Sequence, residues 1–393
     1  MPPPPPLSEI FLAALRLACT SFGGPVAHIA YFRKEYVEKR GWLDEAHFAD
    51  LVALCQFLPG PASSQTIFGI GHQQRGLAGG LVATLGFTLP SAALMIGFAY
   101  GIGVLGNLGA AGWLKGLKVA AVAVVAQAVW LMSRNLCPDW PCRALAVVVA
   151  ATVLWLPFAW SQMAVIGVGA MIGWLAFKAA NAAPQIAPTV SDRRTGTICL
   201  LLFFLLLGVL PLLAHITANP WLEIFDRFYR AGALVFGGGH VILPLLEREV
   251  VNPGWLTHDQ FLAGYGAAQA VPGPLFTLSG YLGAVMNRGP GGVIGGLWAV
   301  LAIFLPAMLL VAGALPFWQK LRHQSGAQAA LRGANAAVVG VLAAALYHPV
   351  WTSGITGGRA AALAGVALVA LLSQRIPVWA VVIGCAAAGA GLL

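Results

Sequence analysis

The chain has 393 residues and a formal net charge of +9, with 59% hydrophobic residues and only 9% charged residues. Globular domains carry about 25% charged residues, which excludes a soluble protein of this length. Long apolar segments exclude a disordered chain. The composition predicts an all-α polytopic membrane protein. Its positive charge is expected to fix orientation and to suit anions, so the lipid bilayer is an expected partner and nucleic acid is not.

Two related copies of one sequence pattern follow a short proline stub. At an offset of 213 or 214 residues, Phe22-Gly23-Gly24 matches Phe236-Gly237-Gly238, and Pro59-Gly60-Pro61 matches Pro272-Gly273-Pro274. We therefore predict four parts: a disordered stub over residues 1–6, a first repeat over 7–180, a linker with a connecting transmembrane helix over 181–221, and a second repeat over 222–393.

Thirteen hydrophobic segments are expected along the chain, judged by the length that crosses about 30 Å. In chain order, the nine unbroken ones lie at about 77–105, 112–136, 144–160, 161–178, 197–218, 290–318, 327–349, 358–373 and 376–393. Four others, at about 9–32, 46–72, 223–246 and 260–286, contain Gly or Pro in their middles. These four are predicted to be broken or re-entrant helices, since irregular backbone at membrane depth must face protein or water.

The charges of the loops predict that the second repeat is inverted relative to the first. If the broken segments enter and leave on one side, most Lys and Arg residues fall on the cytoplasmic side, as the positive-inside rule requires. The loop over 33–40 then carries four Lys or Arg residues, whereas its counterpart carries only Arg248. Inverted repeats are typical of secondary transporters. If all thirteen segments cross, the repeats can still be inverted, but the 33–40 loop lies outside.

The broken segments predict an anion site near the bilayer midplane. Each Gly- or Pro-rich break ends one helix and begins another, and helix N-termini bind oxyanions through free N–H groups. Inversion brings four such ends together. The candidate substrate-binding residues at the breaks are Gly23, Gly24, Pro25, Val26, Pro59, Gly60, Pro61, Ala62, Gly237, Gly238, Gly239, Pro272, Gly273 and Pro274.

Side chains near the breaks complete the predicted site. The candidates are Arg16, His28, Gln56, Ser63, Ser64, Gln65, Arg230, His240, Gln269 and Thr277. Glu35, Asp50 and Glu249 are candidates for coupling or gating. Structural alternatives stay open: Gly and Pro can simply kink a helix, the arginines can snorkel to headgroups, the histidines can pack, and the glutamates can pair with neighbouring arginines.

The sequence contains no motif that indicates an enzyme. The six cysteines lack metal-ligand spacing, and the chain has no HExxH motif and no nucleophile elbow, so we expect neither a metal nor a cofactor. A passive anion channel is the alternative to a transporter.

Several of these motifs resemble the chromate ion transporter family. They are Thr20 to Pro25 with His28-Ile29, Gly41-Trp42-Leu43, Gln56 to Pro61, and Phe236 to His240. The resemblance covers both repeats and implies a two-domain, long-chain member in the bacterial inner membrane that exports chromate and confers chromate resistance. It also implies sulfate as a competitor or alternative substrate.

The membrane potential favours export over uptake. One elementary charge is worth about 2.3 kcal/mol per 100 mV, so a dianion leaving an inside-negative cell gains about 4.6 kcal/mol at 100 mV. Potential, proton gradient or both are expected to drive efflux. The residues leave open whether the protein works as a monomer or a homodimer.

Overall fold

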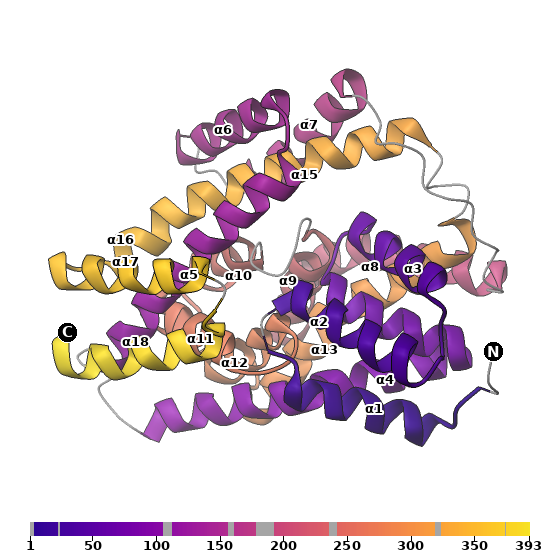
Figure 1. The fold of residues 1–393 in the computed structure, drawn as a ribbon, viewed down its shortest axis with the longest axis horizontal. Coiled ribbons are helices and arrows are strands. Elements are labelled where there is room, and N and C mark those ends of the chain that lie inside the picture. The colour runs from indigo at the N-terminus through magenta and orange to yellow at the C-terminus, as the bar shows by residue number, and fades with distance from the viewer. Residues whose placement is uncertain are drawn as a thin grey trace. The chain divides into compact units, whose positions relative to one another are not determined.

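A computed structural model describes residues 4–22, 24–104, 112–155, 161–177, 192–235, 242–318, 324–373 and 375–393. The secondary structure in these ranges is helical (Figure 1). Each of the nine unbroken segments expected from the sequence overlaps a helix. That all thirteen segments enter the membrane stays a prediction.

The helices of the two repeats follow one another in the same order. The first repeat contains α1 (Leu7–Thr20), α2 (Gly24–Phe32), the π-helical η1 (Arg33–Lys39), α3 (Glu45–Phe57), α4 (Ala62–Val104), α5 (Gly112–Leu136), α6 (Trp140–Trp155) and α7 (Ser161–Ala176). After α8 (Arg193–Thr217), the second contains α9 (Pro220–Ala233), α10 (Ile242–Val250), α11 (His258–Ala270), η4 (Leu275–Thr277), α12 (Leu278–Val285), α13 (Gly292–Ala314), η5 (Leu315–Phe317), α15 (Ser325–Ala345), η6 (Leu346–Trp351), α16 (Thr352–Gly354), α17 (Gly358–Leu372) and α18 (Val378–Leu392).

Helices end and begin at the predicted breaks. α1 ends at Thr20 and α2 begins at Gly24, while α3 ends at Phe57 and α4 begins at Ala62. In the second repeat, α11 ends at Ala270 before η4 begins at Leu275. α1 and α9 have 14 residues each, about 21 Å at 1.5 Å per residue. Each is therefore too short to cross the hydrocarbon core alone.

Side chains at the starts of these short helices explain where they begin. Asp44 accepts a hydrogen bond from the amide of His47 and caps α3, and Thr257 forms a capping box with Gln260 on the corresponding helix α11. Such caps satisfy amides that have no partner within the helix. α3 and α11 therefore start at equivalent residues because equivalent positions carry caps.

Within the described ranges, five helical stretches are long and apolar enough to cross a membrane: Ala62–Gly101, Gly112–Leu136, Arg193–Thr217, Gly292–Phe317 and Ser325–Gly354. The first is in fact two helices, because the backbone leaves the helical conformation at Arg75 and Gly76. The part before this kink matches η4 and α12, and the part after it matches α13. The third stretch is the predicted connecting segment, which exposes apolar side chains such as Leu201, Phe204 and Leu212.

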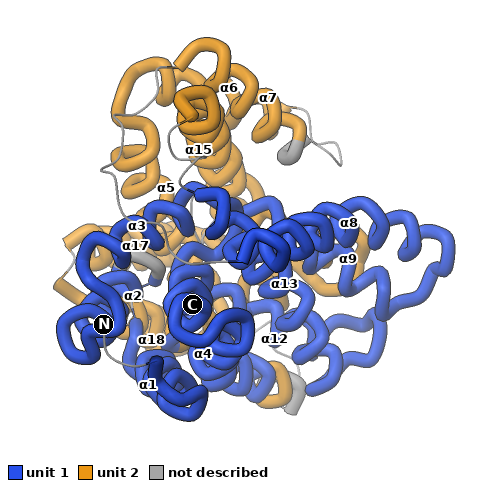
Figure 2. Tube along the Cα trace, turned by 90° about the vertical axis from the view of Figure 1, so that its right-hand side faces the viewer, with its two compact units in different colours: residues 1–98, 182–239, 272–323 blue, residues 99–181, 240–271, 324–393 orange. Residues whose placement is uncertain are grey.

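Two compact units make up the chain, and they do not coincide with the two repeats (Figure 2). Unit 1 contains residues 1–98, 182–239 and 272–323, and unit 2 contains residues 99–181, 240–271 and 324–393. Each unit therefore takes helices from both repeats. All residues of both Pro-Gly-Pro segments belong to unit 1.

In unit 2 the repeats exchange helix partners. α15 of the second repeat packs against α6 and α7 of the first, and α5 of the first packs against α17 and α18 of the second. Glycines permit this close packing. A Cβ atom on Gly116 would lie 2.1 Å from the carbonyl oxygen of Cys385, and one on Gly333 would lie 2.0 Å from that of Gly169. The exchange joins helices of both repeats within unit 2.

The start of the chain contacts α4 within unit 1. Arg75 donates hydrogen bonds to the carbonyl oxygens of Pro4 and Pro5, at 3.0 and 2.9 Å, and Pro5 is buried. These residues of the proline stub therefore lie against α4 at its kink.

Candidate functional site

Two hydrogen bonds connect the breaks of opposite repeats. The amide of Gly60 donates to the carbonyl oxygen of Val235 at 2.6 Å, and the amide of Gly273 donates to that of Ser21 at 3.0 Å. Ser21 aligns with Val235 and Gly60 with Gly273. The two bonds are therefore the same contact made twice, with the roles of the repeats exchanged. We call them the cross-repeat bonds.

Gly60 and Gly273 are required at these positions. Their φ angles are 129° and 102°, a region that side chains strain. A Cβ atom on Gly60 would lie 2.7 Å from Nε2 of Gln65, and one on Gly273 would lie 2.9 Å from Oγ of Ser91. The Cβ of Ala307, which follows Pro306 as Ser91 follows Pro90, lies 3.4 Å from a Cβ placed on Gly60. Each glycine thus fits against the long helix of the other repeat.

The start of α4 presents amides directly beside the first Pro-Gly-Pro segment. The first intrahelical bond runs from the amide of Gln65 to the carbonyl oxygen of Pro61, at 2.9 Å. The amides of Ala62, Ser63 and Ser64 precede it and have no acceptor within the helix. They form the positive end of the α4 dipole.

Buried polar atoms without a hydrogen-bond partner gather on the segments joined by the cross-repeat bonds. Within the described part of unit 1 they include Ser21 Oγ, His28 Nδ1, Ser64 Oγ, Gln65 Oε1 and Thr88 Oγ1. A buried polar atom without a partner costs free energy, and a ligand or water commonly satisfies it. These atoms and the α4 amides define the candidate site.

The two repeats contribute unequal side chains to this site. Gln65 donates from Nε2 to the carbonyl oxygen of Pro59 at 2.7 Å, whereas Leu278 stands at the corresponding position. Ser64 Oγ has no partner among the described residues, but the corresponding Thr277 donates its hydroxyl hydrogen to Pro274 at 2.8 Å. The predicted donors therefore remain available mainly in the first repeat.

Several predicted residues lie away from these contacts or outside the described residues. Gln56 is exposed at the end of α3, and Gln269, in unit 2, leaves a buried Nε2 without a described partner. Gly23, Gly237, Gly238, Gly239 and His240 lie outside the described residues, as do the side chains of Pro25 and Val26.

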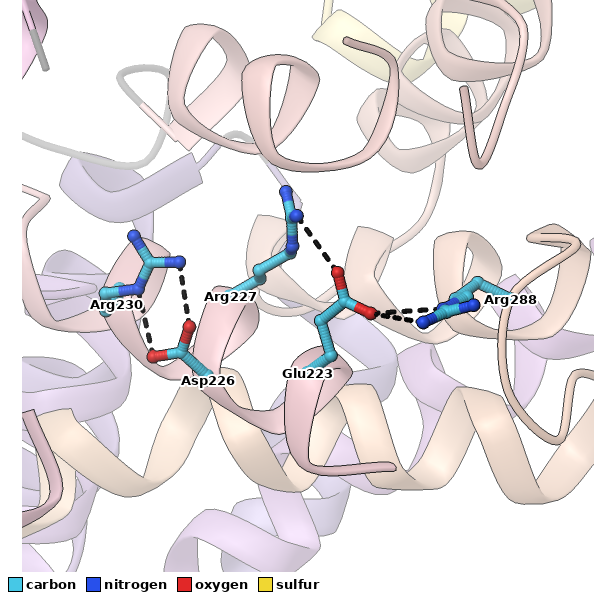
Figure 3. A network of polar contacts seen from close by, with 5 residues as sticks. All are labelled: Glu223, Asp226, Arg227, Arg230 and Arg288. Carbon is cyan, nitrogen blue, oxygen red and sulfur yellow. Dashed lines mark hydrogen bonds and ion pairs between the residues drawn. The ribbon is translucent and has the colours of Figure 1, made fainter. Parts of the chain in front are cut away.

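The two matched arginines have different surroundings. Arg230 forms two bonds with Asp226 one turn earlier on α9, from Nε to Oδ1 at 3.0 Å and from Nη2 to Oδ2 at 2.8 Å (Figure 3). Leu12 stands where the first repeat would need that aspartate, and Arg16 is exposed on α1. The charge of Arg230 is therefore balanced within its own helix.

A second group of charges on α9 links it to the loop before α13. Glu223 accepts from Arg227 at 3.1 Å and from Nη2 of Arg288 at 2.8 Å (Figure 3). Glu9 and Arg75 correspond to Glu223 and Arg288, but Glu9 pairs with Arg40 at 2.6 Å instead. Equivalent positions thus make different contacts in the two repeats.

The three coupling candidates are all engaged. Glu35 pairs with Lys39 at 3.1 Å and with Arg40 at 2.9 Å. Burial alone would raise the pKa of Glu35, but the hydrogen bonds from Arg40 and Lys39 outweigh it and lower the pKa. Asp50 accepts a hydrogen bond from Nε1 of Trp318 at 3.0 Å. Glu249 is buried on α10.

Sequence reasoning missed three residues that the structure brings to the site: Ser21, Thr88 and Ser91. Ser21 lies inside the motif from Thr20 to Pro25, and its alignment with Val235 was the available signal. Thr88 and Ser91 lie on either side of Pro90 in the largely apolar part of α4 that follows its kink. Among the described residues no group of three His, Cys, Asp or Glu is placed to hold a metal ion.

These long apolar helices and interrupted helices define a multi-pass membrane protein of transporter type. The family model described as "Chromate transporter" matches residues 8–174 and 222–390, and the chain belongs to this family. The two matched ranges agree with the repeat found in the sequence, and the family is one of membrane transporters rather than enzymes.

Curated relatives extend over most of the chain. It is 28% identical to a probable chromate transport protein of Synechococcus elongatus, with 86% of this chain and 84% of the relative covered. It is 27% identical to a chromate transport protein of Pseudomonas aeruginosa, over 99% and 93%. It is 28% identical to a chromate transport protein of Cupriavidus metallidurans, over 86% and 82%. No solved structure matches the chain.

Proposed function

We propose that the protein exports chromate, a tetrahedral dianion, from the cytoplasm across the bacterial inner membrane and thereby confers chromate resistance. Family membership and relatives named chromate transport protein support chromate as the substrate. The observation that carries the proposal is the pair of cross-repeat bonds, because they connect both Pro-Gly-Pro segments to the opposite repeat within unit 1.

The oxyanion binds to the amides at the start of α4 and to the polar side chains around the cross-repeat bonds. Helix N-termini attract anions through free N–H groups and the helix dipole. Ser21, Ser64 and Thr88 supply hydroxyl groups that have no described partner. The segments that begin at Gly24 and Leu275 add further donors around the same anion.

The repeats lie upside down relative to each other, and their broken helices meet at the bilayer midplane. Alternating access follows when one side of this pseudo-symmetric site opens as the other closes. The membrane potential drives the dianion outward, with about 4.6 kcal/mol available at 100 mV. Arg16 attracts the anion from the membrane surface, while Glu35, Asp50 and Glu249 belong to the gates.

Flux through proteoliposomes tests this function. Radiolabelled chromate should follow an imposed potassium diffusion potential, saturate with concentration and be inhibited by sulfate. Saturation and exchange against unlabelled chromate separate a transporter from a passive channel. Chromate flux that equals that of empty liposomes would contradict the proposal.

Matched variants connect the flux to the site. Gln65→Leu, which introduces the residue of the second repeat, and Ser64→Ala should each lower flux about tenfold or more, the equivalent of 1.4 kcal/mol in binding. The control is Thr152→Val on α6, because that exposed hydroxyl bonds only to its own helix. Equal flux in all three variants would contradict the proposed position of the site.

A further inference from the structure

His28 is held in one orientation by contacts on three sides. It lies on α2 with 1% of its surface exposed, and its ring meets Phe87 edge-on at 5.4 Å and Phe32 at 6.3 Å between centroids. Nε2 lies 3.2 Å from the carbonyl oxygen of Ser21. A carbonyl oxygen only accepts hydrogen bonds, so Nε2 carries the hydrogen.

This tautomer leaves Nδ1 of neutral His28 as a bare acceptor. Nδ1 is buried and has no partner among the described residues. Its lone pair would repel the oxygen of an anion, whereas a protonated Nδ1 would donate to that oxygen. The imidazole can therefore donate a hydrogen bond from Nδ1 to an oxyanion only after it has gained a proton.

His28 is tied directly to one cross-repeat bond. The carbonyl oxygen of Ser21 accepts from both Nε2 of His28 and the amide of Gly273. Phe87, which contacts the imidazole, also lies beside Gly273, where its carbonyl oxygen is 3.6 Å from a Cβ placed on that glycine. In the second repeat the corresponding position is Ile242, so the equivalent bond of Gly60 has no imidazole at the position of His28.

Other charged groups nearby make their described contacts elsewhere. On the elements next to α2 these groups are Glu35 with Lys39 and Arg40, Tyr36 beside Trp42, His72 beside Phe68, Arg75 with Pro4 and Pro5, and the exposed Arg16. None of the described residues forms an ion pair with His28. An arriving anion is therefore the group that can stabilise an imidazolium there.

We propose that His28 is a proton-dependent ligand of the oxyanion, an inference that rests on the proposed function. One proton from water binds Nδ1 as one dianion enters. Nε2–H then donates to Ser21 and Nδ1–H donates to an oxygen of the anion. The loaded site carries a net charge of −1 instead of −2, so the membrane potential drives its outward step half as strongly as that of an unaccompanied dianion. The proton returns to water when the anion leaves. Anion affinity is thereby coupled to pH at one repeat only.

Calorimetry on the purified full-length protein tests this coupling without any substitution. Chromate is titrated at pH 8, where it is a dianion, in two buffers of different ionisation enthalpy. The expected result is uptake of about one proton per bound chromate. Chromate binding without proton uptake would overturn the inference alone. Absence of chromate binding would overturn both the inference and the proposed function.

Two substitutions separate the ring nitrogens. His28→Gln keeps an amide that can reach Ser21 but has nothing at Nδ1, so it should abolish proton uptake and make the Kd independent of pH from 7.5 to 9. His28→Asn places a permanent donor near Nδ1 and should bind more tightly than the Gln variant. Wild-type Kd should rise up to tenfold per pH unit.

A second, half-buried histidine provides the control. His72→Gln removes a histidine of unit 1 that contacts Phe68 instead of the break, and it should retain the uptake of one proton. Proton uptake that persists in His28→Gln, or that disappears in His72→Gln, would overturn the assignment to His28.

Discussion

The amide of Gly60 donates to the carbonyl oxygen of Val235 at 2.6 Å, although the two residues belong to different repeats. The bond of Gly273 to Ser21 repeats this relationship in reverse. A contact that is made twice with exchanged roles implies that the two repeats pack through equivalent surfaces. It also explains why both Pro-Gly-Pro segments lie in the same unit as Ser21 and Val235.

Substitution of either glycine of the cross-repeat bonds should destabilise the protein. Gly60→Ala and Gly273→Ala combine a strained φ with contacts of 2.7 and 2.9 Å, and each should lower the free energy of unfolding by about 1–3 kcal/mol. Unfolding in detergent at increasing denaturant measures this. Gly97→Ala is the control, because its Cβ would meet nothing within 4 Å. Equal stability of all three variants would contradict the observed geometry.

Loss of the Asp226 carboxylate, which pairs with Arg230, should destabilise the protein more than loss of Arg16, the corresponding arginine of the first repeat. Asp226→Asn removes the carboxylate that pairs with the largely buried guanidinium of Arg230 and should lower the free energy of unfolding by about 3–5 kcal/mol. Arg16→Gln removes an exposed side chain and should change it by less than about 0.5 kcal/mol. Thermal unfolding of both variants decides the order, and the reverse order would show that Arg16 holds the fold.

Stability should fall in acid through Glu35. Because the pKa of Glu35 is lowered in the folded protein, its contribution is complete above the unfolded value of about 4.3 and is lost as pH falls through the folded value. Unfolding midpoints recorded from pH 7 down to pH 3 should therefore drop less in Glu35→Gln than in wild type. Glu38→Gln, which removes an exposed partner of Arg33, should follow the wild-type curve. A Glu35→Gln curve parallel to the wild-type one would refute this contribution.

The exchanged helices of unit 2 should not tolerate a methyl group at their closest approach. Gly116→Ala and Gly333→Ala place a Cβ about 2 Å from a backbone carbonyl oxygen on the partner helix, as the 2.1 and 2.0 Å distances show. Overpacking of this kind costs about 1–3 kcal/mol. Gly384→Ala on α18 meets nothing within 4 Å and should be neutral in the same unfolding assay. Destabilisation by Gly384→Ala equal to that of the other two would contradict the packing explanation, because helix propensity favours alanine over glycine.

The breaks could be predicted from the sequence because glycine and proline act locally. Pro59-Gly60-Pro61 and its counterpart interrupt their segments whatever surrounds them, and α4 and η4 begin at the residues expected. The pairing of breaks across repeats depends on tertiary contacts that no local pattern encodes, so Ser21 and Ser91 were missed. Asp226 stands four residues before Arg230, a spacing that places both side chains on one face of a helix, but Arg230 was predicted as a substrate ligand and not as the partner of Asp226.

The division into two compact units could not be predicted from the sequence either. The repeat boundary lies near residue 180, yet α5 to α7 pack with helices of the second repeat. Repeats report common ancestry of sequence, whereas compact units report where apolar surfaces are buried. The small residues at Gly116 and Gly333 were visible in the sequence, but the identity of the opposing helix was not.

A density map of the protein in lipid nanodiscs with tungstate, an electron-dense tetrahedral dianion, tests the central claim most directly. The account predicts density for the anion at mid-membrane depth, beside the start of α4 and the two cross-repeat bonds, between repeats of opposite orientation. Anion density at the membrane surface, or two repeats that face the same way, would contradict it.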